Sequence, residues 1–66
     1  IGAMNECSGL AQYDKESGIW RIVELCEATK IAQRSIALES ETGEAVAITY
    51  YGKNDIPQIG EQVWID

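Results

Sequence analysis

The stretch that decides the fold is residues 34–51, which reads RSIALESETGEAVAITYY. Two runs of alternating apolar and small or polar residues flank the tetrapeptide Glu-Thr-Gly-Glu at residues 41–44. In the second run, every other residue from Val46 to Tyr50 is β-branched or aromatic, and successive side chains of a strand point to opposite faces. Gly43 can adopt the positive φ that a tight turn requires. The pattern therefore predicts a β-hairpin.

The first run also fits a helix, which is the alternative interpretation. Residues 24–41 are rich in Glu, Ala, Gln, Arg and Leu, all good helix formers, and Gly43 could follow the end of a helix. The apolar residues near helical spacing are Leu25, Ala28, Ala32, Ile36 and Leu38. Alternation favours a strand from Ser35 onward. We expect a strand over residues 35–39, with a short helix or an irregular link at residues 27–33.

The size of the chain indicates one small domain with a small core. Its 66 residues are 45% hydrophobic and 24% charged, as in ordinary globular proteins, and such a chain buries only about 60% of its unfolded surface. We interpret residues 1–4 as a vector-derived remnant and residues 5–66 as a single small β-barrel domain. Trp20 and Trp64 are expected to anchor the core. The sequence contains no run of about 20 apolar residues, so it predicts no transmembrane helix.

The remaining segments add further predicted strands. The five predicted strands are residues 10–13, 19–26, 35–39, 45–51 and 62–66, with turn clusters between them. In the predicted strand at residues 19–26, one face is expected to carry Ile19, Arg21, Val23 and Leu25. The other face is expected to carry Trp20, Ile22, Glu24 and Cys26. This spacing predicts an all-β fold, a small five-stranded antiparallel barrel. The alternative is an α+β fold with one helix at about residues 25–40.

Residues 36–66 resemble the second half of small β-barrels of the OB (S1-like) type. They run as strand, Glu-Thr-Gly-Glu turn, strand, Gly-Lys loop and a final strand entered by Gly-Glu-Gln-Val at residues 60–63. SH3-like barrels share that last feature. In S1-like domains, aromatic and basic groups on the central strands bind nucleic acid. The resemblance implies such places for Tyr50 and Tyr51, but this chain lacks the accompanying basic groups.

The charge of the chain limits its partners. Eleven acidic and five basic residues, with no histidine, give a net charge of −6. Nucleic-acid affinity comes largely from Lys and Arg, and anionic membranes repel acidic proteins. The charge therefore favours solubility, or a basic protein partner, over nucleic acid, with no membrane association. The two cysteines, Cys7 and Cys26, would pair only if the N-terminal segment lies beside the second strand. We expect free thiols and a cytoplasmic location.

The sequence lacks the usual motifs of catalysis. Histidine, the commonest general base and metal ligand, is absent, and neither a zinc motif nor a phosphate-binding glycine loop occurs. Three acids, Glu39, Glu41 and Glu44, cluster at the predicted hairpin tip, but they do not match a calcium loop and are expected to form a solvated turn. We therefore predict that the protein is not an enzyme and holds no cofactor or metal.

The first functional hypothesis is a non-enzymatic acidic module that binds a basic protein partner. Its predicted binding residues are Tyr13, Tyr51, Glu39, Glu41 and Glu44. The tyrosines would be anchors and the acids would steer the encounter. A sharper form is nucleic-acid mimicry, as in inhibitors encoded by phages or mobile elements. A homodimer formed through an unpaired strand edge is also expected at this size.

The second hypothesis is an OB-type protein that binds single-stranded nucleic acid. It would stack bases on tyrosines and contact phosphates through basic side chains. The residues it requires on one face are Tyr13, Tyr50, Arg21, Lys30, Arg34 and Lys53.

Overall fold

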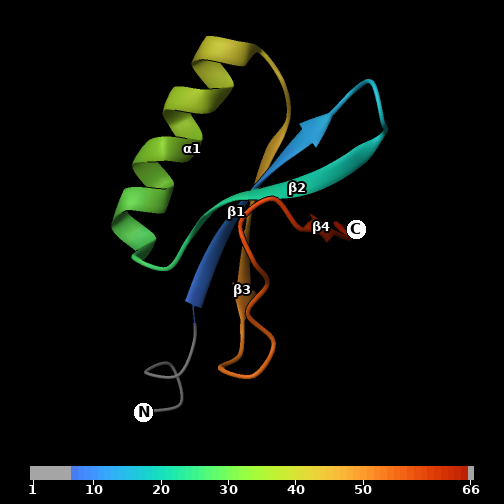
Figure 1. The fold of residues 1–66 in the computed structure, drawn as a ribbon. Helices are drawn as coiled ribbons and strands as arrows, with labels where there is room; N and C mark the ends of the chain where they lie inside the picture. The colour runs from blue at the N-terminus through green and yellow to red at the C-terminus, as the bar shows by residue number, and fades with distance from the viewer. Residues whose placement is uncertain (1–6, 66) are drawn as a thin grey trace.

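The computed structural model describes residues 7–65, which form a curled half-barrel of antiparallel strands with one helix across it (Figure 1). The elements in chain order are β1 (Cys7–Asp14), β2 (Ile19–Leu25), α1 (Ala28–Thr42), β3 (Val46–Tyr51) and β4 (Gln62–Val63). The strand order is β3-β1-β2-β4. The predicted five-stranded all-β barrel is therefore wrong, and the alternative fold with one helix fits. The remnant expected at residues 1–4 lies outside the described residues.

The predicted hairpin is wrong in its first arm, because residues 34–42 belong to α1. Ile31 and Leu38, two turns apart, are buried against the sheet, whereas Ile36 is 68% exposed. The alternation of Ile36 and Leu38 thus does not mark a shared face. Gly43, with φ of 67°, ends the helix, and its N–H donates to the carbonyl of Glu39 at 3.1 Å. The glycine expected in a hairpin turn is a helix C-cap.

The strand predicted at residues 45–51 is confirmed as β3, and the strand predicted at residues 19–26 is confirmed as β2, with one change. β1 pairs with β2 so that Leu10 faces Glu24 and Ala11 faces Ile22, which leaves Val23 as an extra residue in a β-bulge. The bulge shifts the alternation of β2 by one residue. Ile22 and Leu25, predicted on opposite faces, therefore share one face.

Two small clusters of buried side chains lie on opposite faces of the sheet. The helix-side cluster contains Leu10, Ile31 and Leu38, with Val46 packed against it. The cluster on the inner face contains Ala11, Ile22 and Val63, with Trp20, Leu25, Tyr51 and Ile65 packed against it. The neighbouring residues Leu10 and Ala11 are both fully buried, one in each cluster. β1 is therefore covered on both faces.

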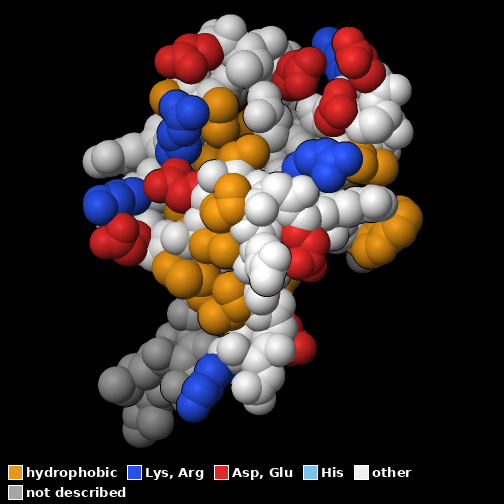
Figure 2. Space-filling view, viewed as in Figure 1, with side chains coloured by type: hydrophobic (Ala, Val, Ile, Leu, Met, Phe, Trp, Pro, Cys, Tyr) orange, Lys and Arg blue, Asp and Glu red, His pale blue; other side chains and the backbone are white. Residues whose placement is uncertain are grey.

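Several large apolar side chains remain on the surface (Figure 2). Trp64, expected in the core, is 88% exposed because it follows the two-residue strand β4, where the sheet ends. Trp20 is half-buried and packs on the inner cluster, as expected. Tyr51 also packs there. Its ring lies so close to Gly9 that a methyl group at that position would be only 2.7 Å from it. Glycine in β1 therefore lets an aromatic ring lie across the strand.

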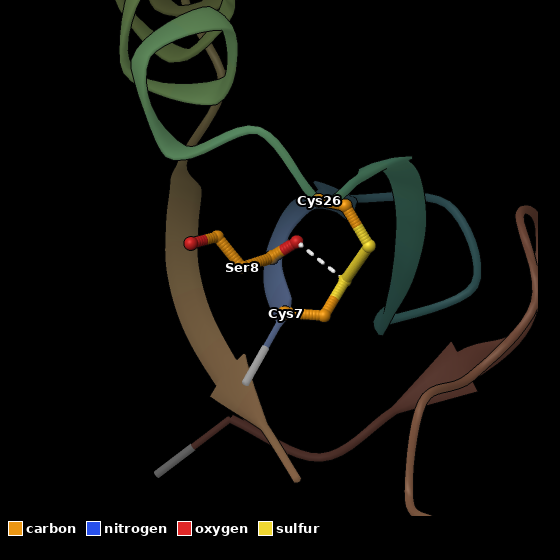
Figure 3. The surroundings of a disulfide bond; sticks show 3 residues. All are labelled: Cys7, Ser8 and Cys26. Carbon is orange, nitrogen blue, oxygen red and sulfur yellow. Dashed lines mark hydrogen bonds between the residues drawn. A yellow bond between two sulfur atoms is a disulfide. The ribbon is translucent and has the colours of Figure 1, made fainter. Parts of the chain in front are cut away.

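A disulfide joins Cys7 in β1 to Cys26, directly after β2 (Figure 3). The expectation of free thiols is therefore wrong: the N-terminal segment does lie beside β2, and the Cys26 N–H donates to the Ser8 carbonyl at 2.6 Å. Cys26 and Glu27 both have positive φ, 63° and 56°, which is unfavourable for residues other than glycine. The disulfide thus holds a sharp turn that leads from β2 into α1.

We expect the Cys7→Ser/Cys26→Ser double variant to lose about 3 kcal/mol of unfolding free energy, because the bond closes a loop of about 20 residues in the unfolded chain. Urea denaturation followed by circular dichroism measures the loss. Mass spectrometry with a thiol-alkylating reagent provides the control, since the native protein should be labelled at neither cysteine before reduction. A variant as stable as the native protein would contradict this role for the bond.

Candidate acidic interface

The C-terminal end of α1, the link to β3 and the β1–β2 turn meet at one end of the molecule, which we call the acidic end (Figure 1). The acidic residues of these segments are Asp14, Glu16, Glu39, Glu41 and Glu44. Gln12 of β1 donates from Nε2 to the Thr42 hydroxyl at 3.4 Å, and the Tyr13 N–H donates to the Ala45 carbonyl at 3.0 Å. These bonds hold the end of the helix against β1. Figure 2 shows acidic side chains along this end.

Thr42 fixes the position of Glu44. The Thr42 hydroxyl donates to the Leu38 carbonyl at 2.8 Å and accepts from the Glu44 N–H at 3.1 Å. A threonine in the last helical turn therefore closes both the helix and the link that follows it. As a result, the half-buried Glu44 lies beside β1 rather than extending into solvent.

A shallow groove of about 260 Å³ opens at this end. Its lining residues are Gln12, Tyr13, Asp14, Arg21, Val23 and Glu44. α1 packs on β1 and β3, so the helix-side surface of β2 beyond them stays open. Within that surface, the bulged Val23 gives the groove an apolar part, and Asp14 and Glu44 give it two carboxylates. Such a groove suits a side chain with an aliphatic stem and a cationic head.

Arg21 is the basic residue of the groove, and a hydrogen bond fixes its side chain. Its Nη1 donates to the Gly60 carbonyl at 3.1 Å, which links β2 to the turn before β4. The guanidinium also lowers the pKa of Asp14, although this is the smallest of the effects on that group. Arg21 therefore has a structural role at one wall of the groove.

The Asp14 carboxylate is stabilised by its own turn. The Ser17 hydroxyl donates to Oδ2 at 2.7 Å, and the Glu16 N–H donates to Oδ1 at 3.0 Å. The hydrogen bond from Ser17, followed by that from Glu16, lowers the pKa of Asp14 below its ordinary value of 3.8. The turn cluster seen in the sequence is thus an Asx-type turn that keeps a negative charge at the acidic end.

The structure brings some of the predicted binding residues together and separates others. Tyr13 and Glu44 line the same groove. Glu39 and Glu41 are exposed on α1, and two residues of a helix are separated by about 200° around its axis, so these carboxylates point to different sides. Tyr51 pairs with Cys7 at the opposite end of β3. The residues therefore do not form the hairpin tip that the sequence predicted.

The tyrosines are also arranged differently from the expectation. The Tyr13 ring packs on Trp20 with centroids 5.3 Å apart, and it is half-buried. Within the Tyr50–Tyr51 pair, Tyr51 joins the inner cluster and Tyr50 is 68% exposed. Tyr51, predicted as a binding anchor, therefore packs in the core, and Tyr50 is the exposed member of the pair.

Sequence reasoning missed Asp14, Arg21 and Val23 as parts of one groove. Asp14 had a local signal, since an Asp followed three residues later by Ser is typical of a capped turn. Arg21 and Val23 had none, because their positions depend on the bulge in β2 and on the area that α1 leaves uncovered.

Within residues 7–65, no group of three or more Cys, Asp or Glu side chains is placed to hold a metal ion. Over the same residues, no helix is long and apolar enough to cross a membrane. Comparisons of the chain with protein-family models, with curated proteins and with solved structures found no match.

We expect Ser17→Ala to raise the pKa of Asp14 toward its ordinary value, because the variant loses the largest of the interactions that favour the ionised carboxylate. Carboxyl ¹³C NMR titration measures the change directly. A carboxyl group with a lowered pKa stabilises the fold above its unfolded pKa, and the contribution is lost as the pH falls through the folded pKa. The variant should therefore be less stable than the native protein near neutral pH and equally stable in strong acid. An unchanged Asp14 titration would contradict the assignment.

Proposed function

We propose that the protein is a non-enzymatic interaction module whose acidic end binds a basic surface of a protein partner. The observation that supports this most is the convergence of three separate chain segments, which bring Glu44 and Asp14 to one groove. None of these three segments alone brings the two carboxylates together. The net charge of −6 would attract a basic surface over distances of about a Debye length.

The groove gives the proposed contact a shape as well as a charge. A Lys or Arg stem would lie on Val23 while its head group meets the Asp14 and Glu44 carboxylates. Glu39 and Glu41, exposed on α1, would act mainly by steering the encounter. Nucleic-acid mimicry is the sharper form of this proposal, in which the partner is a nucleic-acid-binding protein and the module an inhibitor of phage or mobile-element type.

The nucleic-acid-binding alternative has less support from the arrangement of basic residues. Arg21 is bound to Gly60, Lys30 forms an ion pair with Glu27 at 3.1 Å, and Lys53 follows β3 at the other end of the sheet. Lys53 therefore lies at the Tyr50 end of β3, whereas Tyr13 and Arg21 line the groove at the acidic end. Without a shared basic surface, phosphate contacts would be few and the affinity for single strands low.

The proposed cytoplasmic location has an observation against it. Disulfides persist mainly in oxidising compartments and are rare in the reducing cytosol, and the Cys7–Cys26 bond is present in this fold. The disulfide favours a partner met outside a reducing compartment. Measuring the fraction of oxidised protein in lysates quenched with acid tests this point.

Charge reversal tests the acidic end. We expect the triple variant Glu39→Lys/Glu41→Lys/Glu44→Lys to weaken binding to a fluorescein-labelled Lys/Arg-rich peptide by roughly tenfold or more at low salt, because it removes both steering and a groove carboxylate. Fluorescence anisotropy measures the affinity. High salt should release the peptide from the native protein, since exposed charges are screened.

The matched control is Glu24→Lys/Glu27→Lys/Asp55→Lys, which reverses three charges away from the acidic end. Each reversal changes the charge by two units, so both triple variants have a net charge of zero instead of −6. Equal losses in the two variants would show that only net charge matters and would contradict a localised site. Tight binding of labelled single-stranded DNA by the native protein would favour the alternative function.

A further inference from the structure

The outer edge of β3 has no partner within residues 7–65. β3 is the last strand of the sheet, with β1 as its neighbour. The Tyr13 N–H donates to the Ala45 carbonyl, so the Ala45 backbone points toward β1. Backbone groups alternate in direction along an antiparallel strand. Val46, Ile48 and Tyr50 therefore direct three N–H and three C=O groups away from the sheet.

The side chains of this edge do not protect it. Residues 46–51 read VAITYY, without a charge or a proline, the two features that usually block pairing at a sheet edge. Ile48 and Tyr50 lie on the helix side of the sheet, opposite Leu10 and Ser8, yet they are 40% and 68% exposed. Figure 2 shows hydrophobic side chains gathered below the helix in this region. An open hydrogen-bonding edge thus coincides with uncovered apolar surface.

We propose that β3 pairs with β3 of a second copy of the chain, antiparallel and about a two-fold axis that passes beside Ile48. In this register Ile48 faces Ile48 of the second copy, and Val46 faces Tyr50. Each copy contributes six outward backbone groups, so the pairing forms six hydrogen bonds and leaves none of these groups unpaired. The two four-stranded sheets become one continuous sheet of eight strands.

Charges at the two ends of β3 favour a second copy in this orientation. Glu44 precedes the strand and Lys53 follows it. In the antiparallel register, the end of β3 that carries Glu44 lies beside the end of the second copy's β3 that carries Lys53, and symmetry repeats this arrangement. Parallel pairing would instead place Glu44 next to Glu44. Opposite charges at the strand ends thus favour antiparallel over parallel pairing.

The two-fold axis also accounts for the exposed side chains. Because it runs perpendicular to the sheet, both copies of α1 lie on the same face, one on each side of the new seam. Ile48 and Tyr50 of both copies then line the space between the two helices. The surface that α1 leaves uncovered in one copy is thereby covered by the other.

Sedimentation velocity over a range of protein concentrations tests the proposal. We expect the weight-average mass to rise from 7.3 kDa toward twice that value between about 1 µM and about 1 mM protein, since a small interface between two acidic copies gives modest affinity. Ile48→Lys should stay monomeric, because it places two cations beside each other on the axis. Ile59→Lys, which adds the same charge at an exposed isoleucine in the loop before β4, should dimerise normally.

A charge exchange distinguishes the proposed antiparallel pairing from non-specific association through apolar side chains. This test does not require that Ile48→Lys folds normally. Glu44→Lys and Lys53→Glu should each weaken dimerisation roughly fivefold or more, since each replaces attraction with repulsion between the strand ends at two symmetric places, and the double variant should return to within about twofold of the native protein. A native protein that is monomeric throughout the range overturns the proposal. So does a dimer that Ile59→Lys disrupts and Ile48→Lys does not.

Discussion

Leu10 and Ala11 are neighbours in β1, and their side chains are buried on opposite faces of the sheet. The same strand pairs with β2 along one edge and with β3 along the other. Every other part of the fold is placed by β1: the helix packs across it, the inner cluster lies beneath it, and the disulfide ties its first residue to the end of β2. In a chain too small for one large core, a strand buried on both sides joins two small ones.

The strands could be predicted where they show alternation or β-branched residues, as in β2 and β3. The helix could not be separated from a strand by pattern alone, because the segment 35–39 alternates by chance while its neighbours have helical propensity. What decides in favour of α1 is tertiary packing: Ile31 and Leu38 reach the same sheet surface only if the segment is helical. The bulge at Val23 left no signal in the sequence, and it changes which residues of β2 meet.

The candidate site was predictable in composition but not in shape. The sequence indicated an acidic surface around Glu44, and the structure keeps Glu44 beside Tyr13. It could not show that a helix end and a distant turn together form the groove, since that depends on the hydrogen bonds from Gln12 and Tyr13. The proposed partner surface is the groove beside β1 and β2, whereas the proposed dimer interface is the outer edge of β3. Glu44 lines the groove and immediately precedes β3, so it takes part in both proposals.

The most direct test of the central role of β1 is amide hydrogen exchange, followed by NMR at a concentration where the protein is monomeric. β1 amides that pair with β2 or β3, together with those of the buried side of α1, should exchange only on global unfolding. The outward amides of Val46, Ile48 and Tyr50 should exchange much faster, because they lie at an open edge. Protection that is equal in β1 and at these three amides, or lower in β1, would contradict the account.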